Sequence, residues 1–90
     1  MKIYTWKFNQ KAAKEFGKLD RSIQKRLLRW LDDHIEGSNN PRAWGKVLEG
    51  DRGAFWRYRV GGFRIIVDIQ DNQFIVLVAK AAKRNDVYRD

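Results

Sequence analysis

The amino-acid sequence predicts an α+β domain in which two N-terminal helices pack on a small, mostly antiparallel four-stranded sheet, in the order β-α-α-β-β-β. Three observations lead to this prediction. Apolar residues recur with helical spacing between residues 10 and 36, they recur with a period of two from residue 54 onward, and Gly61-Gly62 interrupts this second pattern as a hairpin turn does. The 90 residues are expected to form a single domain, residues 1–90.

The first part of the chain predicts one strand and two helices. Residues 2–8 carry an aromatic side chain at every second position from Tyr4, which predicts a short strand with one aromatic face. Asn9 is suited to cap a first helix from about Gln10 to Gly17. Asp20 is suited to cap a second, longer helix from about Arg21 to Glu36.

The second helix has an apolar stripe and is expected to end at Gly37. The stripe consists of Ile23, Leu27, Trp30, Leu31 and Ile35. The single histidine, His34, falls within this stripe, so a packed and hydrogen-bonded role is favoured over that of a catalytic base. In the loop that follows, Trp44 and Leu48 are expected to fold onto the core.

The second half of the chain predicts a three-stranded meander. Phe55–Val60 and Phe63–Gln70 flank the glycine turn, and Asp71-Asn72 forms the next turn before a last strand from Phe74 to Ala82. Residues 74–79 are apolar at every position, which is typical of a central strand buried on both faces.

Composition narrows the class of partner. The chain has 19 Lys and Arg against 11 Asp and Glu, a formal net charge of +8, so it attracts polyanions such as nucleic acid, an anionic membrane or an acidic protein. A generally basic, solvated surface is the alternative. The chain has no cysteine, and neither a leader-like nor a membrane-spanning apolar run is present, so a cytoplasmic protein without membrane contact is expected.

Two arginines on one strand indicate an anion-binding face. Arg57 and Arg59 are two residues apart and therefore share one side of the strand, and Arg64 enters the partner strand just past the turn. Guanidinium groups match phosphate oxygens, and an aromatic ring stacks on unpaired bases. The other residues expected in this concave basic patch are Lys80, Lys83, Arg84 and Tyr88, with Lys46 and Arg52 as further RNA-binding cations. The alternative is a solvated basic face with the terminal tyrosine packed on the core.

Signatures of other enzyme classes are missing from the sequence. One histidine and no cysteine give no zinc spacing, a Ser-His-Asp set would require His34 to leave its apolar stripe, and the glycines form no phosphate loop. Asp68 and Asp71 would hold a metal only weakly, so neither a metal nor a cofactor is expected. Phosphodiester chemistry would then use the RNA 2′-hydroxyl as nucleophile and arginines as charge stabilisers, which restricts the substrate to RNA.

Four stretches carry a family resemblance: residues 48–50, 55–60, 62–65 and 83–88. With the strand and helix pair before them, they resemble the RelE group of the RelE/ParE toxin superfamily over nearly the whole chain. The resemblance implies a RelE-like fold and a type II toxin that cuts mRNA in the ribosomal A site and leaves a 2′,3′-cyclic phosphate. It also implies the ribosome, mRNA and a cognate antitoxin as partners, with operator DNA bound only through the antitoxin complex.

The resemblance also implies roles for single residues. Arg57 and Arg59 lie where the family commonly has a Lys-x-Lys pair, one lysine of which is a proposed general base. Arg64 matches an arginine that holds the scissile phosphate. Arg84 matches the arginine proposed to stabilise charge or protonate the leaving group, and Tyr88 matches the tyrosine that stacks on the nucleotide.

The sequence departs from the family at two positions. Arg57 is a poorer proton acceptor than lysine because arginine stays protonated. Glu49 replaces a family arginine, and a surface salt bridge is the favoured role for it over that of a base. Two alternatives to the nuclease remain: a ParE-like inhibitor of DNA gyrase that cuts nothing, and a non-catalytic nucleic-acid-binding module. The set of arginines with a terminal tyrosine favours the nuclease over the gyrase inhibitor.

Overall fold

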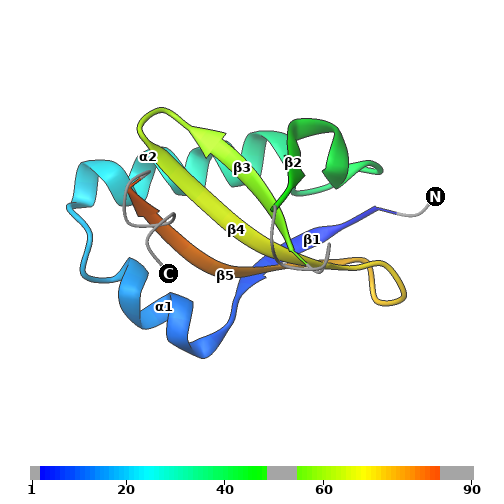
Figure 1. The fold of residues 1–90 in the computed structure, drawn as a ribbon, viewed down its shortest axis with the longest axis horizontal. Coiled ribbons are helices and arrows are strands. Elements are labelled where there is room, and N and C mark those ends of the chain that lie inside the picture. Colours follow the sequence, from blue (N-terminus) through cyan, green and yellow to red (C-terminus); the bar gives the residue numbers. More distant parts are fainter. Residues whose placement is uncertain (1–2, 49–54, 84–90) are drawn as a thin grey trace.

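The computed structural model describes residues 3–48 and 55–83, in which two α-helices pack on one face of a five-stranded sheet (Figure 1). The elements are β1 (Thr5–Phe8), α1 (Gln10–Phe16), α2 (Arg21–His34), the 3-10 helix η1 (Pro41–Trp44), β2 (Gly45–Val47), β3 (Trp56–Val60), β4 (Phe63–Gln70) and β5 (Ile75–Lys83). The strand order is β1-β5-β4-β3-β2, and every neighbouring pair is antiparallel except β1 with β5. The predicted α+β class and the mostly antiparallel sheet are confirmed.

The strand β2 was not predicted from the sequence. It has three residues, begins with Gly45 and pairs antiparallel with β3, so that Lys46 lies directly opposite Arg57. The prediction of four strands was wrong because so short a strand shows no alternation of apolar and polar residues. A short edge strand with a lysine is also a common way to discourage pairing with other chains.

The helix ends agree with the sequence prediction within two residues. The Asn9 side chain accepts a hydrogen bond from the Ala12 N–H at 2.7 Å, which confirms the predicted cap of α1. Asp20 precedes α2 as predicted, but its side chain makes no capping hydrogen bond. The helix ends at His34 instead of Glu36, and Gly37 follows with φ of +79°.

One hydrophobic core fills the space between the helices and the sheet. Its fully buried members from the sheet are Tyr58, Ile65, Val67, Val76 and Val78, and its fully buried members from the helical region are Leu27, Leu31 and Ile35. In Figure 1, α2 passes behind β3 and β4, and α1 lies beside β5. No helix in the described part of the chain is long and apolar enough to cross a membrane.

The middle strand of the sheet is β4, and β5 lies between β4 and β1. Residues 63–67 of β4 are buried at five successive positions, whereas buried and half-buried residues mostly alternate along β5. The prediction that residues 74–79 form a central strand buried on both faces was therefore wrong. Side chains such as Leu77 lie on the face opposite the core, where they stay half-buried.

A polar network joins the start of the chain, η1 and the β4–β5 turn. Tyr4 donates its hydroxyl hydrogen to Oδ1 of Asp71 at 2.6 Å, and Arg42 donates to both oxygens of the same carboxylate at 2.9 and 3.0 Å. The hydrogen bonds from Arg42 and Tyr4 hold the pKa of Asp71 below its ordinary value. The ionised carboxylate is therefore the form that stabilises this corner of the fold.

We expect Asp71→Asn to lower the free energy of unfolding by about 1 kcal/mol at neutral pH, since the ion pair is exposed but bidentate. Because the folded-state pKa is lowered, the stabilisation is complete above the ordinary value of 3.8 and is lost as pH falls through the folded-state pKa. Urea unfolding at neutral and acidic pH measures both effects. A difference between the two proteins that stays constant down to pH 2 would contradict this role.

Candidate nucleic-acid interface

The alternation of residues along β3 separates the core from a basic face. Tyr58 and Val60 are buried in the core, and Arg57 and Arg59 lie on the opposite side of the strand, as the period of two predicts. Arg59 pairs directly with Arg64 on β4. Directly paired residues of antiparallel strands share a face, so the three arginines lie together on the face opposite the helices.

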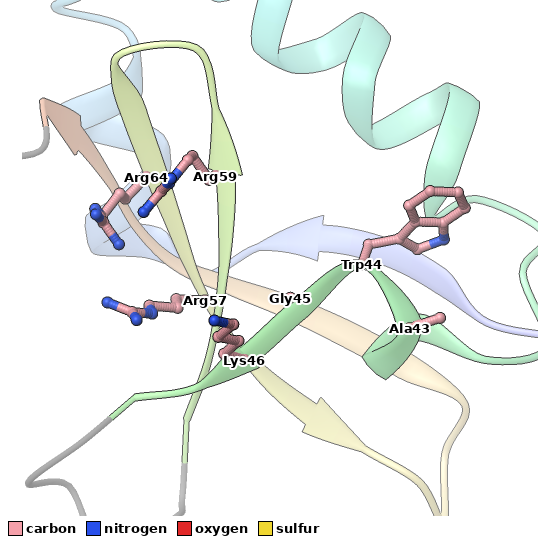
Figure 2. Close-up of a pocket in the computed structure, with 7 residues that line it drawn as sticks. All are labelled: Ala43, Trp44, Gly45, Lys46, Arg57, Arg59 and Arg64. Atoms are coloured by element: carbon pink, nitrogen blue, oxygen red, sulfur yellow. The ribbon is translucent and has the colours of Figure 1, made fainter.

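The three arginines and Lys46 line one hollow of about 370 Å³. Its lining residues are Ala43, Trp44, Gly45, Lys46, Arg57, Arg59 and Arg64. Figure 2 shows the three guanidinium groups pointing to the same side of β3 and β4, with Lys46 below them on β2. The lining residues that the structure describes include four cations and no carboxylate, so this hollow is suited to hold an anion.

The three guanidinium groups differ in burial. Arg59 is exposed, Arg57 is half-buried, and only 2% of the surface of Arg64 is exposed. Because electrostatic interactions strengthen as water is excluded, Arg64 is placed to act most strongly on an anion that reaches it, and Arg59 is placed to meet the anion first.

Gly45 brings β2 close enough to β3 to complete the hollow. A Cβ atom at this position would lie 2.0 Å from the Arg57 carbonyl oxygen and 2.8 Å from Cδ1 of Tyr58. The close approach places Lys46 beside Arg57. This role could not be predicted from the sequence, because a glycine in a loop-like stretch is consistent with many conformations.

Lys80 and Lys83 line a different hollow from the arginines. It has a volume of about 470 Å³ and lies between the end of β5 and the α1–α2 connection. Its lining residues are Glu15, Lys18, Leu19, Asp20, Ile23, Phe63, Lys80, Ala81, Ala82 and Lys83. The strand register nevertheless places Lys80 opposite Ile66, in the same row as Arg57. The described part of the patch predicted from the sequence thus consists of two hollows.

Four candidate site residues lie outside the described residues. These are Glu49, Arg52, Arg84 and Tyr88. Their predicted roles stay predictions.

The residue that the sequence analysis misplaced is Trp44. It was expected to pack on the core, but 51% of its surface is exposed and it lines the arginine hollow. Trp44 is the last residue of η1. The first residue of η1 is Pro41, whose carbonyl oxygen accepts a 2.8 Å hydrogen bond from the Tyr58 hydroxyl on β3. Burial raises the pKa of Tyr58 far above its ordinary value, so the hydroxyl stays a donor and holds η1 in place at any physiological pH.

His34 has the packed role that the sequence predicts. Its Nδ1 lies 2.9 Å from the Trp30 carbonyl oxygen, and its ring stacks on the Trp30 ring at 4.5 Å. It also contacts the ring of Trp44 edge to face at 4.7 Å. No group of three or more His, Asp or Glu residues that would hold a metal occurs in residues 3–48 and 55–83.

Comparison with known proteins gives consistent matches. Residues 6–88 match the family model of the ParE toxin of type II toxin–antitoxin systems, parDE. The chain is 33% identical to a RelE-like toxin protein of Escherichia coli over 88 residues, which cover 94% of this chain and 90% of that protein.

Two solved structures are similar in fold. The toxin–antitoxin complex RelBE2 of Mycobacterium tuberculosis contains a chain with a TM-score of 0.78 at 23% identity, covering 91% of this chain and 99% of that one. The isolated RelE toxin of Escherichia coli gives a TM-score of 0.71 at 26% identity, with 96% and 92% covered. The RelE-like arrangement predicted from the sequence is therefore confirmed at the level of the fold.

Proposed function

Because the chain belongs to the RelE/ParE superfamily of type II toxin–antitoxin toxins, we propose that it stops translation by cutting mRNA in the ribosomal A site. The observation that supports this most directly is the hollow with three guanidinium groups, one ammonium group and no carboxylate among its described lining residues. Such a site neutralises the extra negative charge that a phosphate gains during strand cleavage.

The proposed reaction needs only groups of the RNA and two proton transfers. The 2′-oxygen attacks the adjacent phosphorus while the bond from phosphorus to the 5′-oxygen breaks. The 2′-hydroxyl loses one proton to a base, and the departing 5′-oxygen gains one proton. The products are a 2′,3′-cyclic phosphate and a 5′-hydroxyl, and DNA is excluded because it lacks the nucleophile.

The different burial of the arginines suggests which phosphate oxygens each of them would contact. Arg64 and Arg57 are the more buried pair and would hold the non-bridging oxygens of the scissile phosphate. Arg59 is exposed but pairs directly with Arg64, so it would contact the same phosphate from the solvent side, and the exposed Lys46 would hold a neighbouring phosphate. Arginine stays protonated, so we assign the three arginines to charge stabilisation, treat Lys46 as a phosphate contact and place the base elsewhere. Arg84 and Tyr88 are proposed to complete the site, on the basis of the family resemblance alone.

Inhibition of DNA gyrase is a second candidate function. It is favoured by the family model that matches, which describes ParE toxins. It requires no cleavage and no ordered set of guanidinium groups, whereas the chain places three of them in one hollow. The nuclease therefore explains the arrangement of residues better.

Two assays run side by side separate these functions. We expect the purified protein to stop cell-free translation of a reporter mRNA and to leave DNA supercoiling by gyrase unchanged. The control is the same protein mixed with its cognate antitoxin. Inhibited supercoiling with intact translation would overturn the nuclease and establish the gyrase inhibitor.

We also propose that an acidic antitoxin covers the basic face in the resting cell. A net charge of +8 favours an acidic partner, and one of the similar structures is a toxin–antitoxin complex. We expect the protein to co-purify with the product of the adjacent gene. The complex of the two should dissociate more easily at high salt.

A further inference from the structure

Trp44 is an exposed aromatic residue beside a cationic hollow. Half of its surface is exposed to solvent, although tryptophan has a large, mostly apolar ring that is usually buried. It lines the same hollow as Lys46 and the three arginines. The mechanism proposed above gives it no role.

The indole is held in place from behind by a series of rings that reaches the core. His34 contacts it edge to face at 4.7 Å, and His34 stacks on Trp30 at 4.5 Å. Trp30 in turn packs on the buried ring of Tyr58 at 5.1 Å. The ring is therefore positioned before any ligand arrives, which lowers the entropy cost of stacking on it.

The position of the ring relative to the cations fits a nucleic-acid strand. Figure 2 shows the indole turned toward α2, away from the guanidinium groups of Arg59 and Arg64, with Gly45 and Lys46 between the ring and these groups. The Cα atoms of Trp44 and Lys46 are two residues apart and hence at most about 7 Å from one another. A strand whose phosphates meet the cations and that continues past Lys46 would bring a neighbouring nucleotide to this edge of the sheet, where half of the indole surface is exposed.

We propose that Trp44 is a stacking platform for an unpaired RNA base next to the nucleotide whose phosphate the arginines hold. Base–aromatic stacking works for every base, because each has a π face, and it commonly accompanies cationic grooves that hold single strands. This inference rests on the proposed function in that it requires the hollow to bind RNA. It adds a contact with a base, which the cations do not provide.

The test measures binding of a fluorescently labelled, single-stranded oligouridylate at low salt. We expect Trp44→Ala to weaken binding about 5- to 150-fold and Trp44→Phe to weaken it much less. The slope of affinity against salt should stay unchanged, because no phosphate contact is removed. An abasic strand of equal length should bind equally to Trp44→Ala and to the unaltered protein. The matched control is Val47→Ala, which changes an exposed apolar residue on the adjacent strand β2. Val47 pairs with Trp56 and does not line the arginine hollow.

Each outcome decides the inference. Equal affinity of Trp44→Ala and the unaltered protein for the oligouridylate would overturn the platform while leaving RNA binding by the arginines intact. Loss of antitoxin binding alone would also overturn it and make Trp44 an anchor for a protein. Failure of the unaltered protein to bind the oligouridylate would overturn the platform, whereas the proposed function, which requires the ribosome, is decided separately by primer extension on programmed ribosomes. If Trp44→Ala does not fold, the fallback measurement is quenching of tryptophan fluorescence by RNA. RNA should quench the fluorescence of Trp44→Phe less than that of the unaltered protein. Equal quenching of the two proteins would contradict the platform.

Discussion

Arg59→Ala is expected to slow A-site cleavage by about 10²- to 10³-fold, the usual cost of removing one group that stabilises charge in a transition state. Arg59 is exposed, pairs directly with Arg64 and lines the arginine hollow. The free energy of unfolding should change by no more than about 0.5 kcal/mol, because the side chain makes no contribution to the core. Loss of activity with retained stability is the signature of a functional residue.

The matched control is Arg29→Ala, which removes the same charge from an exposed position on α2. It should keep most of the activity, since α2 packs on the opposite face of the sheet from the arginine hollow. Arg59→Lys should lie between the two, because lysine keeps the charge and loses the planar fork. An equal loss of activity in Arg59→Ala and Arg29→Ala would show that net charge matters and the hollow does not.

Gly45→Ala is expected to destabilise the protein by about 3 kcal/mol or more. The new methyl group would meet the Arg57 carbonyl oxygen at 2.0 Å and the Tyr58 ring at 2.8 Å. Neither is the end of a flexible side chain: one is backbone in β3, and the other is fixed in the core by its hydrogen bond to Pro41. The strand β2 must move away from β3, and the hollow loses the wall that carries Lys46.

Urea unfolding measures this effect, and Gly62→Ala is its control. A Cβ atom at Gly62 would meet nothing within 4 Å, so we expect a change of at most about 0.5 kcal/mol. Equal stability of Gly45→Ala and Gly62→Ala would contradict this close approach of β2 to β3.

Most elements of the fold were predictable because the sequence determines them locally. The bounds of Phe63–Gln70 were predicted without error, since a glycine turn precedes this strand and an aspartate turn follows it. The Asn9 cap and the packed His34 were likewise visible in the local pattern. The bounds of the last strand were predicted within one residue, but its burial was not, because burial on both faces depends on what covers the sheet, which a run of apolar residues does not specify.

The candidate site was predictable only in part, for similar reasons. A period of two placed Arg57 and Arg59 on one face, and the glycine turn placed Arg64 beside them. The edge strand with Lys46, and the exposure of Trp44, depend on contacts between η1, α2 and β3, which are distant in sequence. The second hollow with Lys80 depends on the α1–α2 connection for the same reason.

Cleavage of mRNA in the A site is tested most directly by primer extension on an mRNA held in a programmed ribosome. We expect discrete cuts within the A-site codon, which are absent from naked RNA and from ribosomes treated with Arg59→Ala. Because the reaction uses the 2′-hydroxyl, an mRNA with 2′-deoxy nucleotides in that codon should stay intact. Intact mRNA after treatment with the folded, unaltered protein would contradict the proposed nuclease function.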